Sequence, residues 1–189
     1  GVIVGGVGAG ARGNRLERNG VGLLVDASAS QVRIEGNAIE RNRDDGVRLG
    51  RTSGGRIRLT ANRITGNGSA AIAVMPGGPE TAPPVVTAVD GRRGVAAGTA
   101  CPGCVVEVFT DPGAQAARVT GLTATADAAG AWSVRGLIFV PADTNVTATT
   151  SQGADTSRLS APFPTDGGTA WTLAERPGAS PGTLRNRRL

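Results

Sequence analysis

Short runs of alternating apolar and polar residues recur along residues 1–75. Val32–Glu35 (VRIE) is followed 25 positions later by Ile57–Thr60 (IRLT), and Gly46–Leu49 (GVRL) is matched by Gly20–Leu23 (GVGL) and Ala71–Val74 (AIAV). A period of two is typical of a strand that buries one face. Gly, Asn and Ser separate the runs, as they do at turns. The pattern predicts about three short strands in each repeat.

An Asn-rich phrase of six residues occurs three times in the same region, with steps of 23 and 25 residues between its copies. A period in this range is the signature of a solenoid. Parallel strands need a long connection, so each strand is expected to pair with its counterpart in the next repeat, about 4.8 Å away. The sequence predicts a parallel β-helix with aliphatic files inside and amide ladders at two corners. The expected ladders are Asn14, Asn37, Asn62 and Asn19, Asn42, Asn67; the expected files are Leu16, Ile39, Ile64, then Val21, Val47, Ile72, then Leu23, Leu49, Val74.

Residues 13–74 resemble the right-handed parallel β-helix repeat of pectate-lyase-like and carbohydrate-binding proteins. The motif that carries the resemblance is G-N-x-I-x-x-N followed by G-V-x-L and V-x-I, in two strong copies and a weaker one where Ala61 and Ala71 replace Gly. The resemblance implies a right-handed coil but no single activity, because this fold hosts lyases, hydrolases, epimerases, adhesins and stalks. Since the chain begins within the pattern, at Gly1–Val4, we expect further coils upstream in a longer protein.

A second, all-β domain is expected after the repeats. Residues 76–84 are rich in Pro and Gly, as domain linkers are. Residues 85–163 contain short alternating strands between turn signals, which predicts a small β-sandwich. This part resembles the bacterial immunoglobulin-like domains attached to secreted β-helix proteins, and its Gly/Pro/Arg-rich continuation, 164–189, is expected to be a flexible tail. The resembling pieces are Cys101–Phe109, Ala126–Trp132 and Val146–Thr150, and the expected core anchors are Phe109, Trp132 and Leu137.

The two cysteines, Cys101 and Cys104, flank Pro-Gly, which suits a type II turn. Such a turn brings its ends within about 7 Å, and a disulfide needs Cα atoms about 4.4–6.8 Å apart. We expect a structural disulfide, typical of an oxidising compartment, with free thiols as the alternative. A redox pair at a helix N-terminus and a zinc site, which takes about four ligands, fit a chain with two Cys and no His less well.

Two sets of charged residues are candidates for a site. Asp44 and Asp45 lie together at one corner and are the catalytic candidates. The enzymes that the repeat resembles often use clustered carboxylates to hold calcium, with Arg or Lys as base, or Asp groups as acid and base, and paired carboxylates can split their pKa values. Calcium needs about six to eight oxygen ligands and few are visible, so no cofactor is expected unless the chain is enzymatic. Arg33 and Arg58 share an outward file, and Arg48 faces out nearby. Because the guanidinium group of Arg can form bidentate hydrogen bonds with carboxylates and sulfates, these three are the candidate substrate-binding residues.

Composition narrows the function classes. All 20 basic residues are Arg, the net charge is +5 and only 3% of residues are aromatic. No stacking platform for nucleic acid and no apolar run of about 18 residues for a membrane span is visible. We therefore expect a secreted or cell-surface bacterial module, noncatalytic, that binds a polysaccharide or cell-surface glycan, in particular an acidic one, with the sandwich as spacer or anchor. The alternatives are a polysaccharide lyase or glycoside hydrolase whose active coils lie upstream, and a structural stalk.

Overall fold

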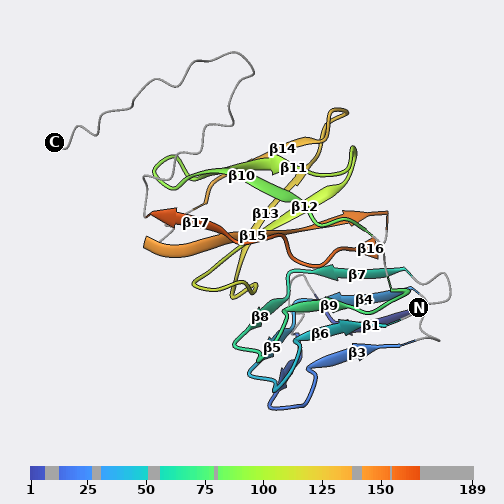
Figure 1. The fold of residues 1–189 in the computed structure, drawn as a ribbon. Coiled ribbons are helices and arrows are strands. Elements are labelled where there is room, and N and C mark those ends of the chain that lie inside the picture. Colours follow the sequence, from blue (N-terminus) through green and yellow to red (C-terminus); the bar gives the residue numbers. More distant parts are fainter. Residues whose placement is uncertain are drawn as a thin grey trace.

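The computed structural model describes residues 1–6, 13–26, 31–50, 56–78, 81–137, 142–153 and 155–166. These residues are all-β: parallel coils form one part and antiparallel sheets lie against the end of that stack (Figure 1). The parallel strands form three sheets, one on each side of the coil. The sheets are β1 (Val2–Gly5), β4 (Val32–Glu35) and β7 (Ile57–Thr60); β2 (Arg15–Glu17), β5 (Ala38–Glu40) and β8 (Arg63–Thr65); β3 (Leu23–Val25), β6 (Val47–Leu49) and β9 (Ile72–Val74).

The interior of the coils is a continuous aliphatic core. Leu16, Ile39 and Ile64 stack in register, as the sequence predicts. In the second and third coils each strand also lies where the pattern placed it. The core consists of Val25, Val32, Ile34, Ile39, Val47, Leu49, Ile57, Leu59, Ile64, Ala71 and Ile72, with Val4, Leu16, Leu23 and Val74 partly buried against it.

The predicted register of the third sheet was wrong in the first coil. Val47 pairs with Leu23 rather than Val21, and Leu49 pairs with Val25, a shift of two residues. The reason is Gly22, which packs so closely on Gly46 that a Cβ atom there would lie 2.5 Å from the Gly46 carbonyl oxygen. Gly20 and Gly22 are each followed by an apolar–x–apolar sequence, so either could align with Gly46 in the motif. The close backbone packing shows that Gly22 is the residue that aligns.

The two Asn files form hydrogen-bonded ladders at the corners. The Asn37 Oδ1 accepts from the backbone N–H of Asn14 at 2.9 Å, and the Asn37 amide donates to the Asn62 Oδ1 at 3.0 Å. The Asn42 backbone N–H and amide both donate to the Asn67 Oδ1, at 3.1 and 2.9 Å. Most Asn residues of the ladders directly follow a residue with a positive φ, in the left-handed region of the backbone. These residues are Arg18, Arg41 and Gly66 in one file, and Gly36 and Ala61 in the other. Each such corner is therefore a left-handed bend followed by an Asn that satisfies the neighbouring backbone.

The antiparallel part consists of two packed sheets. One contains β10 (Val85–Asp90), β11 (Val95–Thr99) and β14 (Ala131–Arg135). The other contains β13 (Arg118–Thr125), β12 (Val105–Asp111), β15 (Ala142–Gln152), β16 (Asp155–Thr156) and β17 (Phe163–Asp166), which pairs with β15. Trp132 and Leu137 lie in the core between the sheets, together with Val106, Val108, Val146 and Ala148. We call residues 81–166 the sandwich.

The sandwich lies directly against the last coil, with β16 beside β7 (Figure 1). Phe109 and Ala116 belong to the hydrophobic cluster of the coils, so the prediction of Phe109 as an anchor of the sandwich interior was wrong. The reason is that β12 is buried on both faces: Val106 and Val108 point into the sandwich, while Glu107 and Phe109 face the β-helix. The two parts therefore share one continuous apolar contact.

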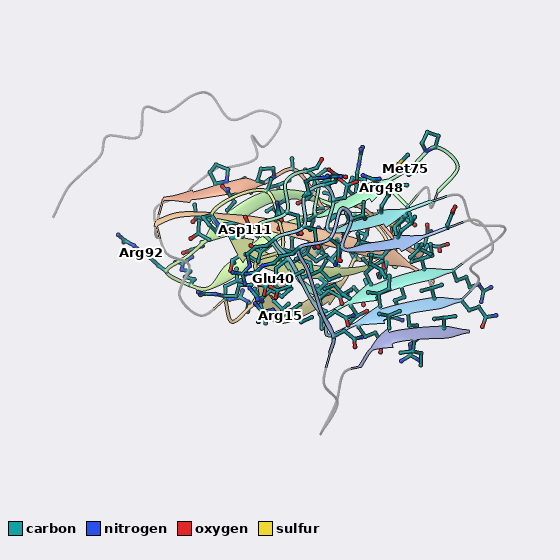
Figure 2. The ribbon with its side chains drawn as sticks, turned by 90° about the horizontal axis from the view of Figure 1, so that it is seen from below. Arg15, Glu40, Arg48, Met75, Arg92 and Asp111 are labelled. Atoms are coloured by element: carbon teal, nitrogen blue, oxygen red, sulfur yellow. A yellow bond between two sulfur atoms is a disulfide. The ribbon has the colours of Figure 1, made fainter. Side chains whose placement is uncertain are left out.

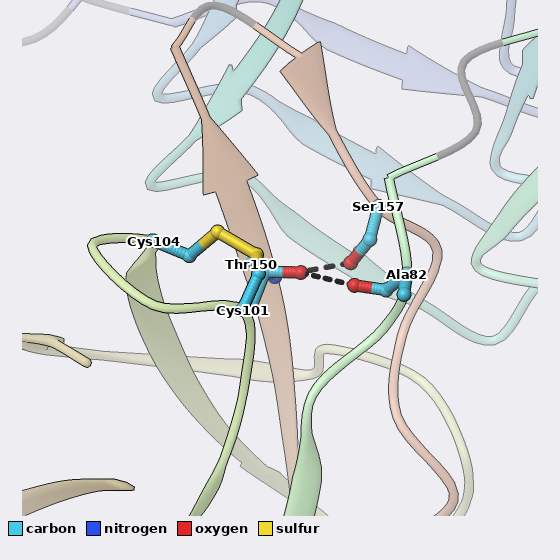
Figure 3. Close-up of a disulfide and its surroundings, with 5 residues drawn as sticks. All are labelled: Ala82, Cys101, Cys104, Thr150 and Ser157. Atoms are coloured by element: carbon cyan, nitrogen blue, oxygen red, sulfur yellow. Dashed lines mark hydrogen bonds between the residues drawn. A yellow bond between two sulfur atoms is a disulfide. The ribbon is translucent and has the colours of Figure 1, made fainter. Parts of the chain in front are cut away.

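A disulfide joins Cys101 and Cys104 in the tight turn that leads from β11 in one sheet to β12 in the other (Figure 3), with Cα atoms 5.4 Å apart. Gly103 has a φ of 73°, and the Cys104 N–H donates to the Cys101 carbonyl, as in a tight turn. Nearby, the Thr150 hydroxyl donates to the carbonyl oxygen of Ala82, in the segment that enters from the coils. This entry segment is therefore bound to β15.

Of the predicted flexible tail, residues 164–189, all residues after 166 lie outside the described part.

We expect Asn37→Ala to lower the free energy of unfolding by about 3 kcal/mol, since it leaves two partly buried backbone groups, the Asn14 N–H and the Val4 carbonyl, without this partner and removes the middle rung of the ladder. The Asn37 amide also donates to the Val4 carbonyl at 2.9 Å, and the residue is only 1% exposed. Urea denaturation measures the change. Asn14→Ala, at the exposed first rung, is the control and should cost less than about 1 kcal/mol. Equal losses in both variants would contradict a role for burial.

Candidate functional site

A groove of about 720 Å³ lies on the outward face of the sheet β1–β4–β7. Alternation puts Val32 and Ile34 inside this sheet and their neighbours outside. The outward residues Ile3, Arg33 and Arg58 are in register, one from each coil. The lining residues are Gly1, Ile3, Gln31, Val32, Arg33, Glu35, Arg56, Arg58 and Thr60. With three arginines against one glutamate, the described lining is positively charged.

Arg33 and Glu35 form a bidentate pair inside the groove. The Arg33 Nε and Nη2 donate to the two carboxylate oxygens of Glu35 at 2.7 and 3.0 Å. This hydrogen bonding holds the pKa of Glu35 below its usual value against the opposing effect of burial, with a further contribution from Arg58, and it raises the pKa of Arg33. The pair orients Arg33 but neutralises much of its charge.

Arg56 and Arg58 have no such partner. Both are exposed, and among the described residues neither side chain makes a hydrogen bond or an ion pair. Their positions, two residues apart at the start of β7, place both in the groove. Sequence analysis included Arg58 but missed Arg56, which precedes the strand. Extending the alternating pattern of apolar and polar residues by one position before Ile57 would have placed Arg56 on the outward face.

The neighbouring face, on sheet β2–β5–β8, is also rich in arginine, but its charges are paired. Glu40 contacts Arg15 at 2.9 Å, Arg41 at 3.3 Å and Arg63, while Glu17 contacts Arg15 and Arg41. Figure 2 shows Arg15 and Glu40 close together. Burial would raise the pKa of Glu40, but the surrounding guanidinium groups hold it below its usual value. The network fits a stabilising role better than anion binding.

The structure does not bring Arg48 to the groove. Arg48 lies on β6, in the third sheet, where its Nε and Nη2 both lie 2.7 Å from the Asp45 Oδ2. Asp45 is buried, and its other oxygen accepts from the Ala70 N–H at 3.1 Å, so it ties two coils together. Asp44 lies at the surface near Arg43, at 3.7 Å. Asp44 and Asp45 are therefore engaged with separate arginines rather than set to act together.

Metal binding finds no support in these residues. Nowhere in the described ranges do three or more Cys, His, Asp or Glu side chains gather in a way that would hold a metal ion. Asp44 and Asp45 do not fit the oxygen-rich shell of calcium, since one of them is fully occupied by Arg48 and a backbone N–H. The same ranges contain no helix long and apolar enough to cross a membrane.

Comparison with known families identifies the first part of the chain. Residues 2–82 match the family described as "Right handed beta helix region". This match fixes the right-handed sense of the coils, and it covers all three parallel sheets. No curated protein matches the chain. The right-handed β-helix is thus shown, and the match assigns it no specific function.

A buried acid, Glu107, lies where the right-handed β-helix meets the sandwich, at the corner that follows β7. Its Oε1 accepts from the Ala61 N–H at 2.9 Å, and its side chain is almost completely buried. Burial raises the pKa of Glu107 to about 7, although the Ala61 N–H and the charge of Arg58 lower it. Sequence analysis missed Glu107 because a single acid within an apolar strand has no periodic counterpart.

The raised pKa predicts a pH dependence of stability. The folded state holds the Glu107 proton up to pH about 7, whereas the unfolded chain releases it near pH 4.5, so the free energy of unfolding falls as pH rises between these values. We expect Glu107→Gln, which keeps the acceptor oxygen, to match the wild type near pH 4 and to exceed it at pH 8 by up to about 3 kcal/mol. Urea denaturation across this range measures the difference.

Glu40→Gln provides a control of opposite sign. The pKa of Glu40 is lowered in the folded state, so its ionised form stabilises the fold above the unfolded pKa, and this contribution disappears as pH falls through the folded pKa. The Glu40→Gln variant should therefore be less stable than the wild type at pH 8 and approach it in acid. A Glu107→Gln variant with the same profile would contradict the burial argument.

Proposed function

We propose that this chain is a noncatalytic module for polysaccharide binding or attachment, and that the groove on β1–β4–β7 holds an acidic glycan. The observation that carries the proposal is the pair Arg56 and Arg58, two exposed guanidinium groups that form no hydrogen bond or ion pair with the described residues, beside the oriented Arg33. Guanidinium groups bind carboxylates and sulfates in a forked geometry. The partner is therefore a polymer that carries such groups.

The spacing of the arginines supports an extended ligand. Arg56 directly precedes β7 and Arg58 lies in it, so in an extended backbone their Cα atoms are about 6.7 Å apart. Arg33 pairs in register with Arg58 on the adjacent strand, about 4.8 Å away. A polyanion with regularly repeated charges can contact all three groups at once. A compact anion can use only part of this array.

The chemistry of the groove supports binding over catalysis. Among the described lining residues Glu35 is the carboxylate, and it is held ionised by Arg33. A glycoside hydrolase needs a second carboxylate as well. Asp44 and Asp45, the other candidates, lie at the corner before β6, away from this sheet.

The sandwich supports an extracellular or cell-surface location. Its Cys101–Cys104 disulfide is of the kind that persists in oxidising compartments. Its two antiparallel sheets around Trp132 agree with kinship to bacterial immunoglobulin-like domains. Within this proposal the sandwich holds the binding face of the β-helix in a fixed position.

We expect the Arg56→Ala/Arg58→Ala double variant to bind polygalacturonate or alginate about tenfold or more weakly than the wild type, because it removes two charge-assisted contacts. Titration calorimetry at low and high salt measures the affinities. Arg92→Ala/Arg135→Ala is the matched control, since it removes the same charge from exposed positions on the sandwich; Figure 2 shows Arg92 extending away from the coils.

Two results would reject the proposal. One is equal affinity of the wild type for neutral dextran and for the acidic polymers. The other is an equal loss of affinity in the groove variant and in the control, which would mean that overall charge rather than the groove binds the glycan. Release of sugar products by the wild type would instead support the enzymatic alternative.

A further inference from the structure

The last coil presents backbone N–H groups that no further coil covers, and the sandwich binds them one by one. On β7, the Ile57 N–H donates to the Asp155 Oδ1 at 3.0 Å and the Leu59 N–H donates to the Thr156 Oγ1 at 3.1 Å. Ile57 and Leu59 are alternate residues of one strand, and Asp155 and Thr156 are consecutive residues of β16. Two side-chain oxygens thus take the place of two carbonyls of a neighbouring strand.

Atoms of the sandwich also replace the hydrogen-bond acceptors of a next coil at the following corner and on β8. At the first corner the Ala61 N–H donates to the Glu107 Oε1 at 2.9 Å. On β8 the Ile64 N–H donates to the backbone carbonyl of Ala116 at 2.9 Å, in an antiparallel bridge. Ala116 is also buried in the core of the coils. Two of the three sheets of the β-helix therefore end on polar atoms of the sandwich.

At the second corner the sandwich extends the Asn ladder itself. In the ladder, the Asn67 Oδ1 accepts from both the backbone N–H and the amide of Asn42. One step on, the Gln115 Oε1 accepts from both the backbone N–H and the amide of Asn67, at 3.1 and 3.2 Å. The Gln115 amide also donates to the Asn67 carbonyl at 2.7 Å. Gln115 makes the same pair of contacts that the Asn of a fourth coil would make.

We infer that the coil-facing surface of the sandwich, formed by Glu107, Gln115, Asp155 and Thr156, is a recognition site for the end of an Asn-ladder β-helix. Its partner is defined by chemistry: a row of free backbone N–H groups along parallel strands, with an Asn at the corner whose backbone N–H and amide still lack the acceptor that the next rung of the ladder would supply. By binding this end it terminates the solenoid and removes an edge open to pairing with other chains. This role is independent of glycan binding.

Backbone amide hydrogen exchange, followed by NMR in the full chain, tests the inference. Gln115→Ala should make exchange at the Asn67 N–H about tenfold or more faster, while the Asn42 N–H, one rung inside the ladder, changes much less. Gln152→Ala, which truncates an exposed amide of the same sandwich, is the matched control and should change neither. Uniform acceleration at both rungs, or none at Asn67, would overturn the inference.

A double-mutant cycle between Asn67→Ala and Gln115→Ala tests the pairing of the rung directly. The melting temperatures of the two single variants and the double variant should be clearly non-additive, as expected for residues in one network; additivity would overturn the role of Gln115. If Asn67→Ala does not fold, Thr156→Val gives a second test, because it removes a hydroxyl at nearly constant volume and should accelerate exchange at Leu59 alone. Unchanged affinity for acidic polymers in these variants separates this inference from the proposed function.

Discussion

The hydrogen-bonding edge of each coil is the constraint on which this structure depends. A parallel strand leaves half of its backbone groups directed at the next strand, and these groups must find partners when they are buried. In the two inner junctions the next coil supplies them, and the Asn ladders do the same at the corners, where the backbone turns away. At the last coil the requirement is the same but the repeat has ended. The sandwich meets it with unrelated side chains, so its position follows from the needs of the coil.

The contact between the sandwich and the last coil also sets where the sheet of the groove ends. Because β16 lies beside β7, the sheet that carries Arg33, Arg56 and Arg58 is bounded at one end by the sandwich. The arginine array therefore lies on a sheet whose last strand is covered rather than open. Glu107 connects the groove with the contact between the sandwich and the last coil. Its side chain is buried in that contact, and the charge of Arg58 in the groove lowers its pKa.

Periodic features were predictable from the sequence, and features that occur once were not. The strand pattern, the Leu16–Ile39–Ile64 file and the Arg33–Arg58 pairing repeat from coil to coil, so spacing alone places them. The shift at Leu23 arose because two glycines fitted one motif and only packing distinguishes them. Arg48 was grouped with the other arginines because alternation shows that a residue points outward but not on which of three sheets. Glu107 and Gln115 contact the coils through residues 46 and 48 positions away in sequence, respectively, without any repeated signal.

The distance along the chain between the last coil and its cover has a consequence for biosynthesis. The contact between Ile57 and Asp155 spans 98 residues. A ribosome that adds about 5–20 residues per second needs about 5–20 s to make that stretch. During this interval the nascent β7 edge has emerged without its partner, at the stage when open strands are most prone to join other chains. The speed of translation through the sandwich thus sets how long each new molecule is exposed to misassembly.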